Sequence, residues 1–140
     1  MNEKVKTALR YRKEGYNCTQ AVIGVYCDQL KIDRDTAICL AEGFGSGMGN
    51  GQGICGAVSG AVMAAGLKNS SGPSKPYTKA ATYKLASKIM QEFQEKNGTL
   101  ICRELKRGTK GRTARSCEGC IEDAIKAADK VLGDEKIAWI

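Results

Sequence analysis

Residues 55–60 read Cys-Gly-Ala-Val-Ser-Gly and place a thiol at the predicted start of a helix built almost entirely from small residues. Gly56 and Gly60 lie four positions apart, and residues four apart share one face of a helix. Because that face carries almost no side chains, we expect another segment to pack very close to it. A helix start also presents unpaired N–H groups and a positive dipole end, which favour the thiolate form of Cys55.

Glycine occupies every second position from Gly43 to Gly53, directly before this helix. Residues 51–56 also match the dinucleotide pattern GxGxxG, but that pattern works only between a strand and a helix, and strand patterns are nearly absent here. The glycines instead favour close approach of the backbone to a ligand or to another segment, or simple loop flexibility. Their amides can stabilise thiolates or the sulfurs of a cluster. We therefore predict four cofactor-binding positions in and after this stretch: Gly47, Gly49, Gly53 and Gly56.

Helical patterns extend over most of the chain. We predict a helix ending at Gly15, a helix over 18–30 capped by Asn17, a helix from Asp33 to about Glu42, a helix over about 54–67, a long helix from Pro76 to just before Gly98, a short helix capped by Thr99, and a last helix that opens at Cys117 or Glu118 and ends at Gly133. The expected fold is a single domain over residues 1–140, an irregular all-α bundle of about five to seven helices with a glycine-rich loop.

The chain has 140 residues, seven cysteines, no histidine and a formal net charge of +7. An odd number of cysteines excludes complete pairing within one chain. No apolar segment follows the charged N-terminus, which argues against secretion, and the uncharged stretch 43–67 is too rich in glycine to span a bilayer. We expect a cytoplasmic protein without membrane insertion, whose cysteines stay reduced unless they bind metal or cycle.

Six basic residues crowd one short stretch: Arg103, Lys106, Arg107, Lys110, Arg112 and Arg115. The favoured interpretation is a solvated surface loop, and the alternative is a site for phosphate or nucleic acid. Aromatic residues are sparse in this stretch, so it lacks the stacking platforms of single-strand binders. Nucleic acid is therefore disfavoured as a partner.

Cys18, Cys55 and Cys102 each lie near a predicted helix start, where backbone amides stabilise anions. Cys117 and Cys120 form the only CxxC, a spacing that can chelate one metal or close a disulfide, with two incidental thiols as the alternative. A thioredoxin-like protein would need a βαβ surround, and a zinc ribbon a second CxxC. We expect Arg115 to lower the pKa of the CxxC thiols.

Cys27 and Cys39 differ from the other five because they fall well inside apolar helical segments. A buried free cysteine behaves as a small hydrophobe. We therefore interpret both as structural and expect both to be unreactive.

Several of these features occur in a fixed order: Cys18 in Asn-Cys-Thr-Gln-Ala, the 43–49 glycine loop, the 55–60 motif, Cys102 in Cys-Arg-Glu-Leu, and a final cysteine before the last helix. In order, spacing and length the chain resembles the C_GCAxxG_C_C family of small redox-active proteins, which have four cysteines and a Cys-Gly-Ala-x-x-Gly motif around the second. The resemblance covers nearly the whole chain. It implies redox activity. It also implies a link to transporters, beside whose genes members often occur, and to split-Soret cytochromes, in which a related domain accompanies haem and an iron–sulfur centre has been proposed.

The resemblance implies a set of four redox thiols: Cys18, Cys55, Cys102 and Cys120, with Cys117 as the alternative fourth cysteine. We predict that these four thiols converge, that Cys55 is the most reactive, and that the same four together with Cys117 are the candidate metal ligands. The chain has no CxxCH site for covalent haem.

Three functions follow as expectations. The first is a thiol-based redox or electron-transfer protein, with or without an iron–sulfur cluster. The second is a metal-binding or metal-delivery protein linked to a transporter, because four thiolates suit iron–sulfur, zinc or copper(I) alike. The third is a basic interaction module with structural cysteines. The expected partner is an unidentified redox protein or a transporter, a homodimer is left open, and no hydrolytic constellation is present.

Overall fold

The computed structural model describes residues 2–30, 32–74, 76–109 and 111–133. These residues form helices and turns without a β-strand, apart from isolated bridges at Ile54–Ile101 and Thr109–Arg112, so the all-α prediction is confirmed. The elements are α1 (Glu3–Lys13), α2 (Cys18–Leu30), α3 (Arg34–Ala41), η1 (Glu42–Phe44), α4 (Gly45–Met48), α5 (Gly56–Asn69), η2 (Gly72–Ser74), η3 (Pro76–Thr78), α6 (Lys79–Asn97), α7 (Cys102–Arg107) and α8 (Cys117–Leu132). Within the described ranges, no helix combines the length and apolar character needed to cross a bilayer.

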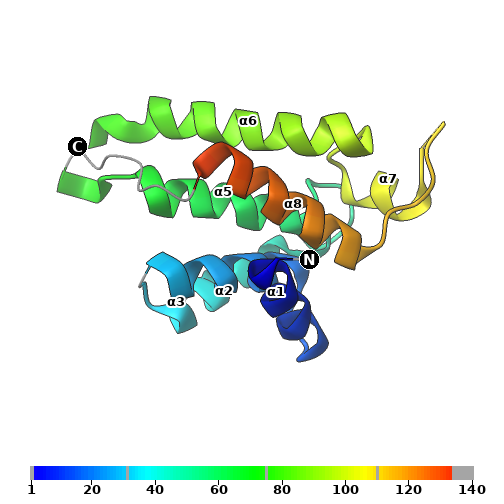
Figure 1. Cartoon of the computed structure of the whole chain (residues 1–140), viewed down its shortest axis with the longest axis horizontal. Helices are drawn as coiled ribbons and strands as arrows, with labels where there is room; N and C mark the ends of the chain where they lie inside the picture. Colours follow the sequence, from blue (N-terminus) through cyan, green and yellow to red (C-terminus); the bar gives the residue numbers. More distant parts are fainter. Residues whose placement is uncertain (1, 31, 75, 110, 134–140) are drawn as a thin grey trace.

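Helix α5 lies at the centre of the molecule (Figure 1). It packs against α2, α6 and α8, and α8 crosses in front of it between α6 and the α1–α3 group. Large buried side chains fill the space between the layers, chiefly Ile89 and Phe93 of α6 with Ile121 and Ile125 of α8. The first turn of α8 and the short helix α7 lie at the same end of the molecule (Figure 1), which is the end where the cysteines gather.

The face of α5 that carries Gly56 and Gly60, called the small face here, packs against α2, as the glycine spacing predicts. A Cβ atom added at Gly60 would lie 2.8 Å from Cβ of Val22, and one added at Gly56 would lie 2.7 Å from Oγ1 of Thr19. The Thr19 hydroxyl donates a 2.8 Å hydrogen bond to the Gly56 carbonyl. This close crossing holds the start of α5 beside the start of α2 and therefore brings Cys55 toward Cys18.

Capping side chains determine where α1, α2 and α8 begin. Asn17 and Gln20 exchange hydrogen bonds at the start of α2, with the Asn17 side chain accepting from the Gln20 amide at 2.9 Å. The Ser116 hydroxyl accepts from the Gly119 amide at 3.0 Å, so α8 begins at Cys117. At Asp33 and Thr99 the structure differs from the capping that the sequence predicts. Asp33 accepts from the Thr36 hydroxyl and makes no cap hydrogen bond, while Ile101 takes the cap position of α7 and Thr99 accepts from its amide at 3.1 Å.

The glycine-rich segment folds into left-handed turns that run beside the start of α7. Ser46, Gly47 and Met48 have φ values of 56°, 60° and 63°. A Cβ atom at Gly47 would lie 2.4 Å from Cβ of Cys102, so only glycine fits at this contact. The Cys102 amide donates to the Gly53 carbonyl at 3.0 Å. The segment therefore positions α7 and its cysteine against the start of α5.

Candidate functional site

Five cysteines line one pocket of about 240 Å³, and each comes from a helix start. Cys18, Cys102 and Cys117 are the first residues of α2, α7 and α8, Cys55 is the residue that precedes α5, and Cys120 lies in the first turn of α8. The structure thus brings together the four thiols predicted to converge, and Cys117 with them. Because four helices point their positive ends toward the same space, the pocket favours negative charge on sulfur.

Cys18 and Cys117 form a hydrogen-bonded pair across the junction of α2 and α8. The hydrogen bond from Cys18 is the largest effect on Cys117 and, with further help from Arg12 and Lys106 and against the opposing effect of burial, it lowers the pKa of Cys117 to about 5. The same contact, together with burial, raises the pKa of Cys18 far above its usual range. At neutral pH the pair therefore holds one proton, with Cys117 as the thiolate and Cys18 as the donor.

Cys55 and Cys120 form a second pair, across the junction of α5 and α8. The hydrogen bond from Cys120 lowers the pKa of Cys55 against the opposing effect of burial, and the amides of Ala57 and Val58 lower it further. The pKa of Cys120 is raised by that hydrogen bond and by burial. This pair lies deeper than the first, because Cys55 and Cys120 are 5% and 3% exposed whereas Cys117 is half-buried.

Cys102 lines the same pocket outside both pairs. Burial raises its pKa, and the positive charge of Lys106 opposes that rise. Its side chain lies against Gly47. Of the glycines predicted to hold a cofactor, Gly56 lines the cysteine pocket, Gly49 lines a shallower neighbouring pocket, and Gly47 and Gly53 lie against Cys102 and Met48 respectively.

The two cysteines interpreted as structural differ from each other. Cys27 is 1% exposed in a small core formed with Ile23, Ala37 and Ala41, and burial raises its pKa. Cys39, however, is exposed, so the prediction that it is buried is wrong, while its low reactivity stays a prediction from the sequence. Helix α3 buries Ala37 and Ala41, which are one turn apart, and Cys39 lies between them on the outward side.

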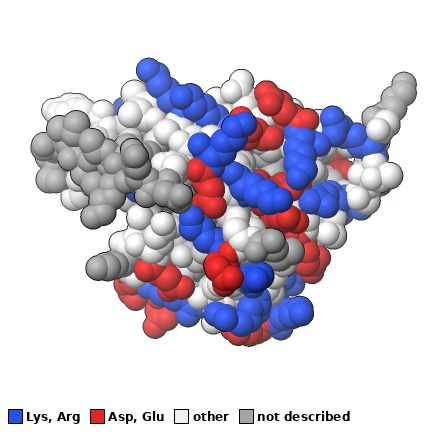
Figure 2. Space-filling model, in the orientation of Figure 1, with Lys and Arg blue, Asp and Glu red and all other residues white. Residues whose placement is uncertain are grey.

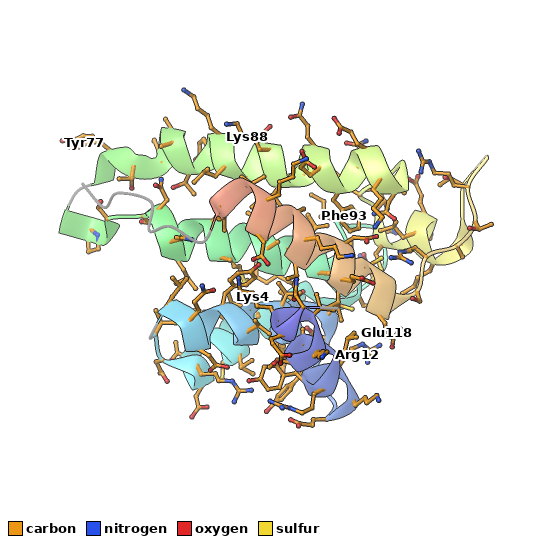
Figure 3. The ribbon with its side chains drawn as sticks, viewed as in Figure 1. Lys4, Arg12, Tyr77, Lys88, Phe93 and Glu118 are labelled. Carbon is orange, nitrogen blue, oxygen red and sulfur yellow. The ribbon has the colours of Figure 1, made fainter. Side chains whose placement is uncertain are left out.

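Two cations act on the site: Arg12, which the sequence did not single out, and Lys106, which the sequence placed in the basic stretch. Arg12 of α1 hydrogen-bonds to Cys117 and Cys18, and Lys106 of α7 lies close enough to favour the Cys117 thiolate. Arg12 and Lys106 both line the pocket. Figure 3 shows Arg12 near the end of α1, beside the start of α8 marked by Glu118. The one sequence signal for Arg12 is that a charged residue shares a helix face with Val5, Ala8 and Leu9.

Arg115 is held chiefly by Asp123, and its positive charge also acts on Cys120 of the CxxC, in the direction that the sequence predicts. Its guanidinium forms a two-pronged ion pair with the buried Asp123 carboxylate, at 3.0 and 3.1 Å. Gly119 makes room for it, because a Cβ atom there would lie 2.4 Å from Cζ of Arg115. The cation that hydrogen-bonds to Cys117 is Arg12 instead, because Arg115 is held one turn further along α8.

The basic stretch is partly occupied by contacts within the molecule. Arg112 donates to the Lys96 carbonyl at 2.6 Å, and Lys110 lies outside the described residues. Figure 2 shows Lys and Arg side chains intermixed with acidic ones over much of the visible face. Arg103, Lys106 and Arg107 of α7 line the shallow pocket that adjoins the cysteine pocket.

In the described part of the chain, no three Cys, Asp or Glu side chains are grouped so that they could hold one metal ion. The arrangement of the pocket cysteines is that of two pairs and one further thiol.

Residues 16–131 match the family model described as "Putative redox-active protein (C_GCAxxG_C_C)". The match includes all seven cysteines and every helix except α1 and the last residue of α8. Comparison with curated proteins gave no match, nor did comparison with solved structures.

Proposed function

Because this chain belongs to the C_GCAxxG_C_C family of redox-active proteins, we propose that it exchanges electrons through two dithiol pairs, Cys18 with Cys117 and Cys55 with Cys120. The observation that carries the proposal is the gathering of five cysteines from four helix starts in a single pocket, and it is supported by the lowered pKa of Cys117 and Cys55 beside the raised pKa of Cys18 and Cys120. A thiolate beside a proton-bearing partner is the arrangement that thiol–disulfide exchange requires.

Cys117 is the thiol that begins the exchange. Its pKa of about 5 makes it ionised at neutral pH, and it is the more exposed thiolate of the two pairs. Its sulfur attacks a partner disulfide, forming a mixed disulfide while the leaving sulfur departs as a thiolate. Cys18 then loses its proton to solvent and attacks the Cys117 sulfur, which releases the second partner thiolate and closes a Cys18–Cys117 disulfide. Two electrons pass to the partner.

Cys55 and Cys120, the deeper or inner pair, supply a further two electrons to Cys18 and Cys117, the outer pair, through the CxxC motif. Cys117 and Cys120 lie in the same turn of α8, so Cys120, after losing its proton to solvent, can attack the Cys117 sulfur of the Cys18–Cys117 disulfide and release Cys18 as a thiolate, which takes up a proton. Cys55 then attacks Cys120, a Cys55–Cys120 disulfide forms, and Cys117 leaves as the thiolate. The CxxC thus connects the two pairs.

A thiol titration tests this proposal. Cys39→Ser protein, which lacks the exposed thiol, is equilibrated without oxygen in dithiothreitol buffers of increasing oxidising strength, and free thiols are counted by mass tagging. We expect four thiols to disappear, with Cys27 and Cys102 still reduced. Loss of none, or of the outer pair alone, contradicts the proposal.

An iron–sulfur cluster or other thiolate-bound metal stays a prediction of the sequence and the family resemblance. The same anaerobic sample is therefore analysed for iron, sulfide, zinc and copper. Stoichiometric metal that protects these thiols from tagging would replace the dithiol mechanism with the metal-binding function. Metal-free protein that loses four thiols supports the mechanism proposed here.

A further inference from the structure

The cysteine pocket is lined by positive side chains without a carboxylate. Arg12, Lys106 and Arg115 line it, and no Asp or Glu is among its described lining residues. Arg115 is paired with Asp123 and its charge acts on Cys120, whereas Arg12 and Lys106 are the cations that act on Cys117. Tyr16, Asn17 and Ser46 add polar groups to the wall.

Arg12 has hydrogen-bonding capacity that the described residues do not use. Its guanidinium contacts the Cys117 and Cys18 thiols, but its Nε–H is buried and makes no hydrogen bond with any described group. A buried donor without a partner costs free energy. An arginine fork is well matched to a carboxylate, which accepts two N–H donors at once.

The approach to the pocket is also basic. Ser46, Cys102 and Lys106 line both the cysteine pocket and a shallower neighbour, whose wall adds Arg103 and Arg107. A cleft lined by charges of one sign concentrates ligands of the opposite sign. The cavity of about 240 Å³ lies just below the roughly 300–1,000 Å³ of most small-molecule sites. It therefore suits a small molecule rather than a folded protein segment.

We propose that the oxidant taken by this pocket is a small anionic disulfide, whose carboxylates lie toward Arg12 and Lys106 while one of its sulfurs faces Cys117. This inference rests on the proposed dithiol function. The Cys117 thiolate attacks one sulfur, a Cys117–substrate disulfide forms, and the substrate S–S bond breaks to release one thiolate, which takes a proton from solvent. Cys18, deprotonated to solvent, then attacks Cys117 and releases the second thiolate. The disulfide substrate is reduced to two thiols, and the Cys18–Cys117 pair is oxidised.

Three symmetric disulfides, each with two methylenes between sulfur and the polar group, test the charge preference: dithiodipropionate (anionic), bis(hydroxyethyl) disulfide (neutral) and cystamine (cationic). The rate of Cys117 oxidation is measured in Cys39→Ser protein and divided by the rate of the same disulfide with dithiothreitol, which corrects for leaving-group differences. Rate ratios between substrates do not depend on the ionised fraction of Cys117, because that fraction cancels. We expect the anionic disulfide to exceed the cationic one by roughly tenfold or more at low salt, with the ratio falling as salt is added.

Lys106→Gln and Lys88→Gln form a matched pair of variants, since each removes one positive charge. Lys88 is exposed on α6 and lies far from Arg12 in Figure 3. We expect Lys106→Gln to reduce the anionic-to-neutral ratio several-fold and Lys88→Gln to leave it unchanged. Equal ratios in both variants, or no preference for the anion in the parent protein, would overturn the substrate assignment while leaving the dithiol function intact. If none of the three disulfides oxidises Cys117, the proposed function itself fails.

Discussion

At the scale of single residues, charge separates the pocket thiols into donors and thiolates. Cys117 has a pKa of about 5, while its partner Cys18 has a raised pKa, so the two share one proton. Arg12 and Lys106 hold the negative charge at Cys117 from two other helices. Cys117 is therefore the strongest candidate nucleophile, rather than Cys55, which is deeper and was predicted from the sequence to be the most reactive.

The pH dependence of Cys117 alkylation follows from this charge state. Because its folded-state pKa is about 5, against an ordinary 9.0, the thiolate is present above about pH 5 and the rate should fall as pH drops through that value. Arg12→Gln should raise the pKa and slow alkylation at pH 6, with the rate recovered in alkaline solution. The control is Arg10→Gln on the same helix, because Arg10 is exposed and does not contact Cys117. Equal pH profiles for the two variants would contradict a role for Arg12.

Cys39 and Cys27 should differ strongly in labelling. Alkylation of the native protein read by mass spectrometry should modify Cys39 early and Cys27 only after unfolding, because Cys39 is exposed and Cys27 is 1% exposed. Early modification of Cys27 would contradict the packing of its core. Sequence could place both residues on helices, but it could not tell which face of α3 is covered. Ile38 and Leu40 flank Cys39, yet Leu40 is 70% exposed, because the inward face is made by the smaller Ala37 and Ala41.

At the scale of helices, the position of each pocket cysteine depends on where its helix begins. The sequence predicted the start of α2 from the Asn17 cap and the start of α8 to within one residue, and Gly15 and Gly133 follow the ends of α1 and α8 as predicted. It could also predict that the small face of α5 is covered. The pairing of Cys117 with Cys18 could not be predicted from local patterns, because it depends on how α8 crosses α1 and α2.

The crossing of α2 and α5 should not tolerate a side chain at Gly60. The variant Gly60→Leu should reduce the free energy of unfolding by roughly 1–3 kcal/mol or more, because its Cβ would lie 2.8 Å from Cβ of Val22 and 3.0 Å from the Thr19 carbonyl. Urea unfolding measures the loss. Gly66→Leu is the control on the same helix, since nothing lies within 4 Å of a Cβ there. Because leucine has a higher helix propensity than glycine, Gly66→Leu should cause no comparable loss, and similar losses in both variants would contradict an effect specific to the crossing.

At the scale of the whole molecule, the pocket joins segments that are far apart in the chain. Cys18 and Cys55 come from the N-terminal part, and Cys117 and Cys120 come from the last helix, which packs against α1, α2, α5 and α6. Oxidation would therefore form two disulfides, each of which joins residues that are far apart in the sequence. The family resemblance correctly pointed to redox chemistry from the sequence, while the cations that tune it emerge only from the packed helices.

Oxidised protein should be more stable than reduced protein for this reason. Each long-range disulfide is expected to add about 2–4 kcal/mol to the free energy of unfolding, chiefly by restricting the unfolded chain. Urea unfolding of the two redox forms in the Cys39→Ser background measures the difference. Cys18→Ser, which keeps Cys117 and therefore the route to the Cys55–Cys120 disulfide, should lose about half of the gain. An oxidised form that is less stable than the reduced form would contradict cross-links at these positions.

The most direct test of the two-pair arrangement is to map the disulfides of the fully oxidised monomer. Cys39→Ser protein is oxidised with dilute diamide, digested without reduction, and analysed by tandem mass spectrometry. We predict Cys18–Cys117 and Cys55–Cys120 linkages in one molecule, with Cys27 and Cys102 free. A Cys117–Cys120 disulfide as the final product, with Cys18 and Cys55 both left as thiols, would contradict the account.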